Sequence, residues 1–367
     1  MNSVMRIILL LLLTTPAVIF SGCATRVGKV SERKGDEIIV AGKMVHTGTR
    51  VVTWMDPGGY DAYRTERRFA PFEESDFEIS KEKVKDLKSP ARYNLRKAGL
   101  TTNEIERVRG GGWDLPTLQK VVDQFVLHFD VTGISRQCFK VLHDHRGLSV
   151  HFLLDVDGTI YQTLDLKERA FHATTSNTRS IGIEIANMGA YSSKTNDVFN
   201  KWYRSNDDGT TDLIFQDWLK PESILTPNFV GHPARSEPVL GEVQGRNLWQ
   251  YDYTPQQYEA LVKLTAALCK TFPKLKCDYP RDAEGNLVTK KLPDDELENY
   301  GGVLGHYHVQ TNKTDPGPAL QWDYVIKNAQ RLMDPSNSPH KAVSLEVENS
   351  LPKDSEQSSE ESAGGAR

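Results

Sequence analysis

A short segment in the last third of the chain carries side chains that could bind a metal ion. Within residues 305–318, His306 supplies an imidazole, Lys313 an ammonium group and Asp315 a carboxylate. Imidazole and carboxylate are both zinc ligands, and the polar residues between them, followed by Pro-Gly-Pro, favour a loop. A catalytic zinc site uses three protein ligands and leaves one position open for water, so a third ligand must come from elsewhere.

The candidate third ligand is His128. It lies in residues 124–131, Gln-Phe-Val-Leu-His-Phe-Asp-Val, a run rich in β-branched and aromatic side chains. Such a run predicts a buried strand that ends near the histidine. A strand holds a ligand more rigidly than a loop does, which favours His128 as the partner of His306 and Asp315.

Several separated motifs follow one another in a recognisable order. The strand with its histidine is followed by Ser-Ile-Gly-Ile-Glu at 180–184, Gly-His at 305–306 and Lys-Thr-Asp-Pro-Gly at 313–317. This pattern resembles the zinc-dependent N-acetylmuramoyl-L-alanine amidases of the AmpD and peptidoglycan-recognition-protein superfamily. The resemblance extends over about residues 120 to 330, and several motifs in order are more specific than any one of them.

The resemblance implies an α/β fold with a mixed central β-sheet flanked by helices, an N-terminal extension and a long internal insertion. It implies Zn²⁺ as cofactor, bound by His128, His306 and Asp315, with the aspartate standing where some relatives place a cysteine. The implied substrate is peptidoglycan or its fragments, cleaved at the amide between N-acetylmuramic acid and L-alanine. A peptidoglycan-binding module without hydrolytic activity and a zinc hydrolase for another amide are the alternatives; the complete metal triad favours an enzyme.

The same resemblance assigns roles to four more residues. Lys313, two positions before Asp315, would stabilise the oxyanion that forms as water attacks the amide. Glu184 would act as general base and then protonate the leaving amine, or else be a structural carboxylate. His151 and His172 match positions near the substrate groove, although plain packing is an equal alternative for His151.

Two further histidines, His143 and His145, are spaced too closely to share a ligand face. Residues two apart on a helix point away from each other, so we expect surface or capping roles for both. The helix that carries them should extend over 136–145, with Ser135 as its N-cap and Gly147 after its end.

Other local signals place the elements around the site. Asp114 and Pro116 predict the start of a short helix, and Asp157-Gly158 predicts a hairpin turn between two strands in 148–160. Residues 180–186 alternate as a central strand would. Thr254 and Pro255 predict a helix that continues to about residue 270.

The first 22 residues have the pattern of a lipoprotein signal peptide. Arg6 is followed by an apolar run that is too short to span a bilayer core of about 20 residues, and the run ends in Ser21-Gly22-Cys23. We expect lipid on Cys23, with an ordinary secretory peptide as the alternative. Ala24 follows instead of an aspartate, which favours the outer membrane, with the protein facing the periplasm.

The remaining chain is divided by composition. Residues 23–110 are predicted to be a tether and accessory segment, 111–335 the zinc amidase domain, and 336–367 a disordered polar tail. Within the domain, the aromatic-rich insertion 190–250 is either a self-packed cover or a wall of the substrate groove. The net charge of −4 gives no reason to expect nucleic acid as a partner. Cys269 and Cys277 could form a disulfide or remain free thiols.

Overall fold

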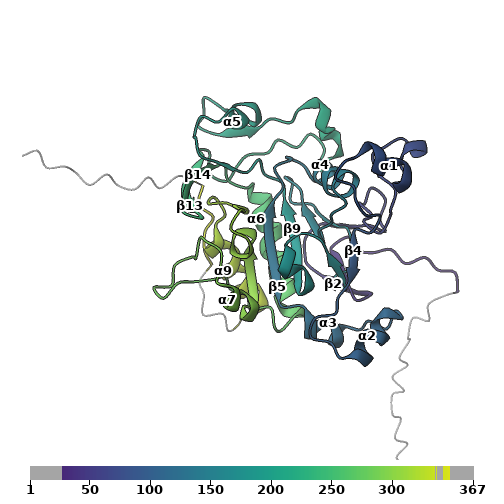
Figure 1. The fold of residues 1–367 in the computed structure, drawn as a ribbon. Helices are drawn as coiled ribbons and strands as arrows, with labels where there is room; N and C mark the ends of the chain where they lie inside the picture. Colours follow the sequence, from purple (N-terminus) through teal and green to yellow (C-terminus); the bar gives the residue numbers. More distant parts are fainter. Residues whose placement is uncertain (1–26, 335, 337–341, 348–367) are drawn as a thin grey trace, which may run out of the picture. The chain divides into compact units, whose positions relative to one another are not determined.

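The computed structural model describes residues 27–334, 336 and 342–347, and Figure 1 shows their arrangement. The chain divides into two compact units, 1–33 and 34–367. Of the first unit, the structure describes residues 27–33, which contain a turn. The predicted signal peptide and Cys23 lie outside the described residues, as does most of the predicted tail. Within the described part of the chain, no helix is long and apolar enough to cross a membrane.

The centre of the second unit is a six-stranded mixed sheet. Its strands, in spatial order, are β15 (Gly302–Gly305), β5 (Gln124–Phe129), β9 (Ser180–Ile185), β6 (Phe152–Leu154), β7 (Ile160–Gln162) and β3 (Val51–Thr53). The pairs β15–β5, β5–β9, β9–β6 and β3–β7 are parallel, and the β6–β7 hairpin is antiparallel. The predicted fold class is therefore confirmed, and β9 occupies the central position that its alternating sequence predicts.

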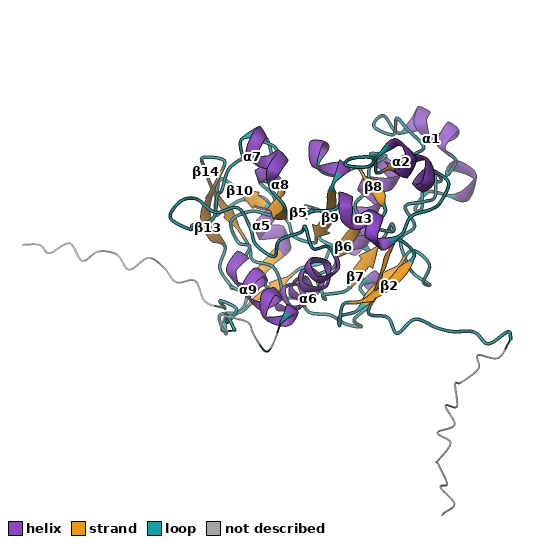
Figure 2. Cartoon of the chain, turned by 90° about the horizontal axis from the view of Figure 1, so that it is seen from below, coloured by secondary structure: helices purple, strands orange, loops and turns teal. Residues whose placement is uncertain are grey.

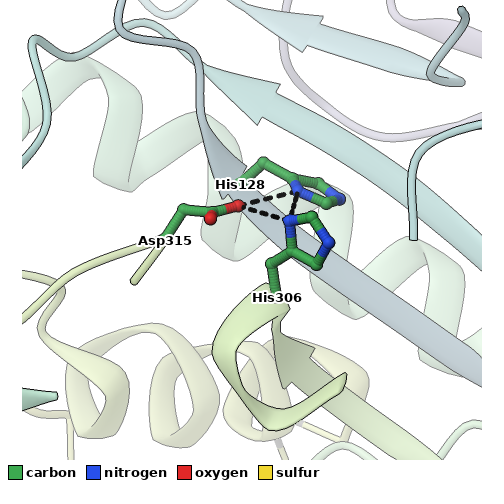
Figure 3. A group of neighbouring side chains, drawn as sticks. All are labelled: His128, His306 and Asp315. Carbon is green, nitrogen blue, oxygen red and sulfur yellow. Dashed lines mark hydrogen bonds and ion pairs between the residues drawn. The ribbon is translucent and has the colours of Figure 1, made fainter. Parts of the chain in front are cut away.

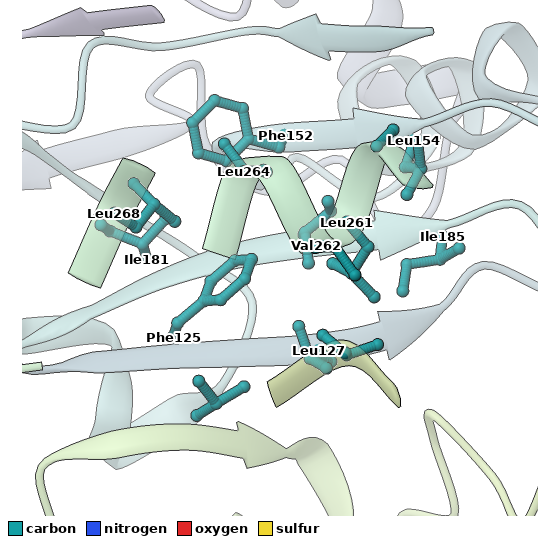
Figure 4. Close-up of a cluster of buried hydrophobic side chains, with 14 of the residues drawn as sticks. Phe125, Leu127, Phe152, Leu154, Ile181, Ile185, Leu261, Val262, Leu264 and Leu268 are labelled. Carbon is teal, nitrogen blue, oxygen red and sulfur yellow. The ribbon is translucent and has the colours of Figure 1, made fainter. Parts of the chain in front are cut away.

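One face of this sheet is covered by α6 (Pro255–Thr271) and α9 (Trp322–Met333). α6 begins where the sequence predicts, because Thr254 and Gln257 form a capping box and Pro255 occupies the first turn. In Figure 4, Leu261, Leu264 and Leu268 of α6 face the apolar side chains of β5, β6 and β9. This layer is the main hydrophobic core of the unit.

The opposite face carries shorter elements and the polar site. α4 (Ser135–Phe139) continues into a π-helix (Lys140–His145), and a 3₁₀ helix (Thr174–Thr178) precedes β9. The predicted cap is wrong by one position, because Ile134 is the N-cap and Ser135 is already in the first turn.

The expected surface or capping role is also wrong for His143, which is 1% exposed. Its ring stacks on Phe139, its Nδ1 lies 2.8 Å from an oxygen of Asp144, and its Nε2 lies 2.9 Å from the carbonyl oxygen of Arg64. The π-helical turn directs this side chain inward, which an α-helical projection of the sequence does not anticipate. His145 is exposed.

The segment 34–110 is part of the same compact unit as the sheet. It contributes the edge strand β3 to the central sheet and the strand β4, which pairs with β8. Its elements are β1 (Glu37–Val40), β2 (Lys43–His46), α1 (Phe77–Lys83), β4 (Tyr93–Leu95) and α2 (Thr102–Arg109), and β8 is Glu168–Ala170. α3 (Leu115–Val121) then starts at Asp114, whose side chain accepts a hydrogen bond from the Thr117 amide, as predicted.

The insertion forms a small layer of its own. Its elements are β10 (Ala190–Tyr191), α5 (Asp197–Trp202), β11 (Tyr203–Ser205), β12 (Thr211–Leu213), β13 (Val239–Val243) and β14 (Arg246–Gln250). The aromatic rings gather in one cluster with Ile134 and Met188, and Tyr203 stacks on Tyr251 with ring centroids 3.9 Å apart. In Figure 1, α5 lies at the top of the view, above β13 and β14. Two short helices outside the insertion, α7 (Asp294–Asn299) and α8 (His306–Val309), are labelled next to each other in Figure 2.

Candidate metal centre

The three predicted metal ligands lie side by side at one edge of the sheet. β5 and β15 are parallel neighbours, so their carboxyl ends meet there; His128 is near the end of β5, and His306 follows β15 as the first residue of α8. Asp315 comes from the loop after α8. Figure 3 shows the three side chains converging, with Nδ1 of His128 2.8 Å and Nδ1 of His306 2.9 Å from the same Asp315 oxygen. The two Nδ1 atoms are 3.0 Å apart.

The outer contacts of the two histidines fit rings that bind a metal ion through Nδ1. Nε2 of His306 lies 2.7 Å from Oε1 of Gln310, an acceptor for its proton when Nδ1 binds a metal ion. Nε2 of His128 lies 3.0 Å from Nδ1 of His172, whose Nε2 lies 3.1 Å from the Ser180 hydroxyl. With Nε2 protonated in both ligands, two nitrogen lone pairs and a carboxylate oxygen face one another.

This donor set fits a zinc ion. Zinc binds histidine nitrogen at about 2.0–2.1 Å and carboxylate oxygen at about 2.0–2.2 Å, so three acceptor atoms about 3 Å apart can all reach one ion. Burial, together with the nearby His306, lowers the pKa of His128 to about 4, so its imidazole is neutral at pH 7, as a ligand must be. Burial alone would raise the pKa of Asp315, but the adjacent His306 and His128 hold it below its usual value, so the carboxylate is ionised.

A pocket of about 230 Å³ opens beside the three ligands. Its polar lining includes Glu184, Lys313 and His172, so the predicted general base and the predicted cation share one cavity with the metal ligands. Part of its wall is apolar and comes from Val131, Leu142, Leu148 and Phe171. Its lining residues include none from the insertion 190–250, whose aromatic rings gather in a separate cluster.

The position of Glu184 follows from strand register. β5 and β9 are parallel, and His128 is directly opposite Glu184, so both side chains point to the same face of the sheet on strands about 4.8 Å apart. Burial raises the pKa of Glu184 well above its ordinary value, and the carboxylates of Asp315 and Asp130 act in the same direction. A carboxylate in this environment is a stronger base than one in water.

The two remaining histidines occupy different positions. His172 lines the pocket and contacts His128; it fits there because Gly182 has no Cβ, which would lie 2.5 Å from the His172 ring. His151 is fully buried and is not among the pocket residues. Its Nδ1 accepts a hydrogen bond from the Gly182 amide and its Nε2 lies 3.0 Å from the carbonyl oxygen of Glu168, as expected for packing.

Sequence reasoning missed the residues that hold these side chains in place. Gln310 contacts His306 from four positions later in the chain, a spacing that could have suggested the pair. Asp130 accepts hydrogen bonds from the Thr132, Gly133 and Asn187 amides and so fixes the loop after β5. The contact of Asp130 with Asn187 has no local signal, because the two residues are distant in sequence.

One comparison with known proteins identifies the family. The family model for N-acetylmuramoyl-L-alanine amidase matches residues 118–318. No curated protein matches the sequence. Among solved structures, the selenomethionine derivative of AmpD is 16% identical, with a TM-score of 0.30, and the alignment covers 65% of this chain and 89% of that one.

Two endolysins give similar values. The amidase LysCS from Clostridium intestinale URNW is 16% identical with a TM-score of 0.28, covering 57% of this chain and 83% of its own. The Ph2119 endolysin from Thermus scotoductus MAT2119 bacteriophage Ph2119 is 16% identical with a TM-score of 0.28, covering 57% and 84%. These low scores carry no argument by themselves. The family match covers more than half of the 367 residues, and the chain therefore belongs to the N-acetylmuramoyl-L-alanine amidase family.

Proposed function

We propose that this protein hydrolyses the amide bond between N-acetylmuramic acid and L-alanine in peptidoglycan or its fragments, with Zn²⁺ bound by His128, His306 and Asp315. The observation that carries the proposal is the convergence of three acceptor atoms within 3.0 Å in a pocket that also contains Glu184 and Lys313. Metal ligands, a base and a cation in one cavity are the parts that amide hydrolysis requires.

The roles of the side chains follow from their positions. When bound, zinc supplies a Lewis acid that makes water a better nucleophile near pH 7. Glu184 accepts the proton of the attacking water, and its raised pKa allows it to keep that proton until the leaving nitrogen takes it. Lys313 donates a hydrogen bond to the oxygen that becomes negative as the carbonyl carbon turns tetrahedral. His172 keeps the ring of His128 oriented through Nε2.

The experiment uses protein without its predicted signal segment, intact sacculi and soluble muropeptides, with and without a chelator. We expect mass spectrometry to detect stem peptides released from muramic acid, and the chelator to abolish the release. His306→Ala should lose both zinc and activity, because the site has no spare protein ligand. His145→Ala, which removes an exposed histidine, is the matched control.

Two outcomes would contradict the proposal. Full zinc content in His306→Ala would reject the ligand set. Binding to sacculi without any released peptide would favour the non-hydrolytic module instead. The soluble muropeptide arm also reports whether intact wall or released fragments are preferred.

We further infer from the sequence that the protein is anchored by lipid on Cys23 in the outer membrane and faces the periplasm. The support is the apolar run that ends in Ser21-Gly22-Cys23. Cys23→Ala should leave the protein soluble or uncleaved. If this variant still fractionates with membranes in its mature form, the lipid anchor is rejected.

A further inference from the structure

The loop that carries two of the three proposed metal ligands has little regular structure of its own. Between β15 and α9 it contains one short helix, α8, and then runs through Asp315 to Ala319 without helix or strand. Its outer side is contacted by the β13–β14 hairpin of the insertion, where a Cβ on Gly241 would lie 2.7 Å from the Cβ of Pro318. The hairpin therefore packs directly against this loop.

The first contact comes from Gln244, in the turn of the hairpin. Its Nε2 donates hydrogen bonds to the carbonyl oxygens of Tyr307 at 2.8 Å and Gln310 at 2.9 Å. Its Oε1 accepts a bond from the Lys291 amide at 3.2 Å, so the amide group is held at both ends. Gln310 in turn contacts Nε2 of His306. Gln244 thus fixes the backbone of the helical turn that presents His306.

The second contact comes from Gln250, at the end of β14, which is fully buried. Its Nε2 donates to the carbonyl oxygen of Pro316 at 3.1 Å, and its Oε1 accepts from the Ala319 amide at 3.0 Å. Gly317 lies between these two partners with a φ of +83°, and a Cβ there would lie 2.1 Å from Oε1 of Gln250. The side-chain amide of Gln250 therefore forms hydrogen bonds with the backbone on both sides of Gly317, directly after Asp315.

Gln250 also connects the loop to the strand that carries the proposed base. Its Nε2 lies 3.1 Å from Oδ1 of Asn187, two residues beyond the end of β9. The Asn187 amide donates to Asp130, which fixes the loop after β5. The buried side chain of Gln250 thus contacts both the loop that carries Asp315 and the segment directly after β9, the strand of Glu184.

We infer that the β13–β14 hairpin is a positioning element for the metal centre. Gln244 holds the backbone around His306 in place, and Gln250 holds the backbone after Asp315 in place. This role differs from both a passive cover and a groove wall, because the hairpin acts on the ligands from outside the pocket. The inference rests on the proposed metal site, but it makes a claim about metal affinity that does not require hydrolysis.

The test measures zinc affinity of the full chain by competition with a chelating dye, and the absorption spectrum of the Co²⁺-loaded protein. Gln244→Met and Gln250→Leu keep the approximate side-chain volume but lose the hydrogen bonds. We expect zinc to bind about 10- to 100-fold more weakly, as for other partners that orient ligands. The Co²⁺ spectrum should change as well, because it reports ligand geometry. Glu242→Gln, an exposed position on β13, is the matched control.

Thermal unfolding of the metal-free variants separates positioning from general stability. Gln244 is only partly buried in a turn, so Gln244→Met should fold even if Gln250→Leu does not. Wild-type zinc affinity and an unchanged Co²⁺ spectrum in a folded Gln244→Met would overturn the positioning role of Gln244 and leave the proposed function intact. A wild-type chain that binds no zinc would overturn the metal site itself and the inference with it.

Discussion

The two faces of the β5–β9 strand pair have opposite chemistry although their residues alternate along the same strands. On one face, Phe125, Leu127 and the isoleucines of β9 pack under α6 and α9. On the other face, His128 lies opposite Glu184, and Gly182 leaves room for His172. Neighbouring residues thus serve different purposes, one set holding the sheet in place and the other presenting titratable groups to a pocket.

This contrast explains how buried polar groups are tolerated at the centre of the fold. The apolar face stabilises the fold by burying side chains that need no hydrogen-bond partners, at roughly 25 cal/mol per Å² of apolar surface buried. On the polar face, His128, His172 and Ser180 form a connected chain of contacts, and His151 has backbone partners. Mutations of Glu184 on the polar face and of Leu264 on the apolar face should therefore separate catalysis from stability.

The largest expected effect comes from Glu184→Gln on the polar face. The amide keeps the shape of the side chain but cannot accept the proton, so turnover should fall by about 10²–10⁴. Zinc content and the free energy of unfolding should change little. Turnover near the wild-type value with zinc retained would remove Glu184 from the mechanism. Glu259→Gln, on the exposed side of α6, serves as the charge-matched control.

On the apolar face, Leu264→Ala should have the converse effect. Leu264 is fully buried under the sheet, and Figure 4 shows it beside Phe152. Removing its side chain should lower the free energy of unfolding by about 2–5 kcal/mol. The turnover number and zinc affinity of the folded fraction should stay within a few-fold of wild type. Urea unfolding would measure the loss of stability, and assays below the melting temperature would measure turnover and zinc affinity. A large loss of zinc affinity would contradict the separate roles of the two faces.

The third effect is a pH dependence on the polar face. Burial and the adjacent Arg96 lower the pKa of His151 to about 3, whereas in the unfolded chain it is about 6.5. At pH 7 neither state binds the proton. Below pH 6.5 the unfolded state binds it first, so stability falls by about 1.4 kcal/mol per pH unit, or about 3 kcal/mol by pH 4.5.

The His151→Gln variant tests this pH dependence. Its unfolding free energy, measured with urea between pH 7 and 4.5, should decrease less steeply than that of wild type. The difference between the two slopes should correspond to about one proton taken up on unfolding. The Leu264→Ala variant should keep the wild-type slope while its curve is displaced downward. Parallel curves for wild type and His151→Gln would mean that His151 does not resist protonation in the folded state.

Local sequence signals were sufficient where the interactions are short in range. The capping residues Thr254 and Asp114 marked helix starts correctly, because each bonds to an amide three residues later. The alternation in 180–186 identified a central strand, because side-chain direction in a strand repeats every two residues. The same locality explains the error at His143, where a π-helix replaced the expected α-helix and turned the side chain inward.

The resemblance named the ligand triad, but only the tertiary structure brought its members together. His128 and His306 are 178 positions apart, and they meet because parallel β5 and β15 end at the same edge of the sheet. The insertion shows the limit most clearly. Its aromatic content indicated a packed layer. The contacts of Gln244 and Gln250 with the loop of His306 and Asp315, however, depend on how two distant segments dock. Neither glutamine has a local sequence pattern that marks it. Sequence determined which strands and helices form and which side chains could do chemistry; strand register and docking decided which of them meet, because those contacts join residues that no local periodicity connects.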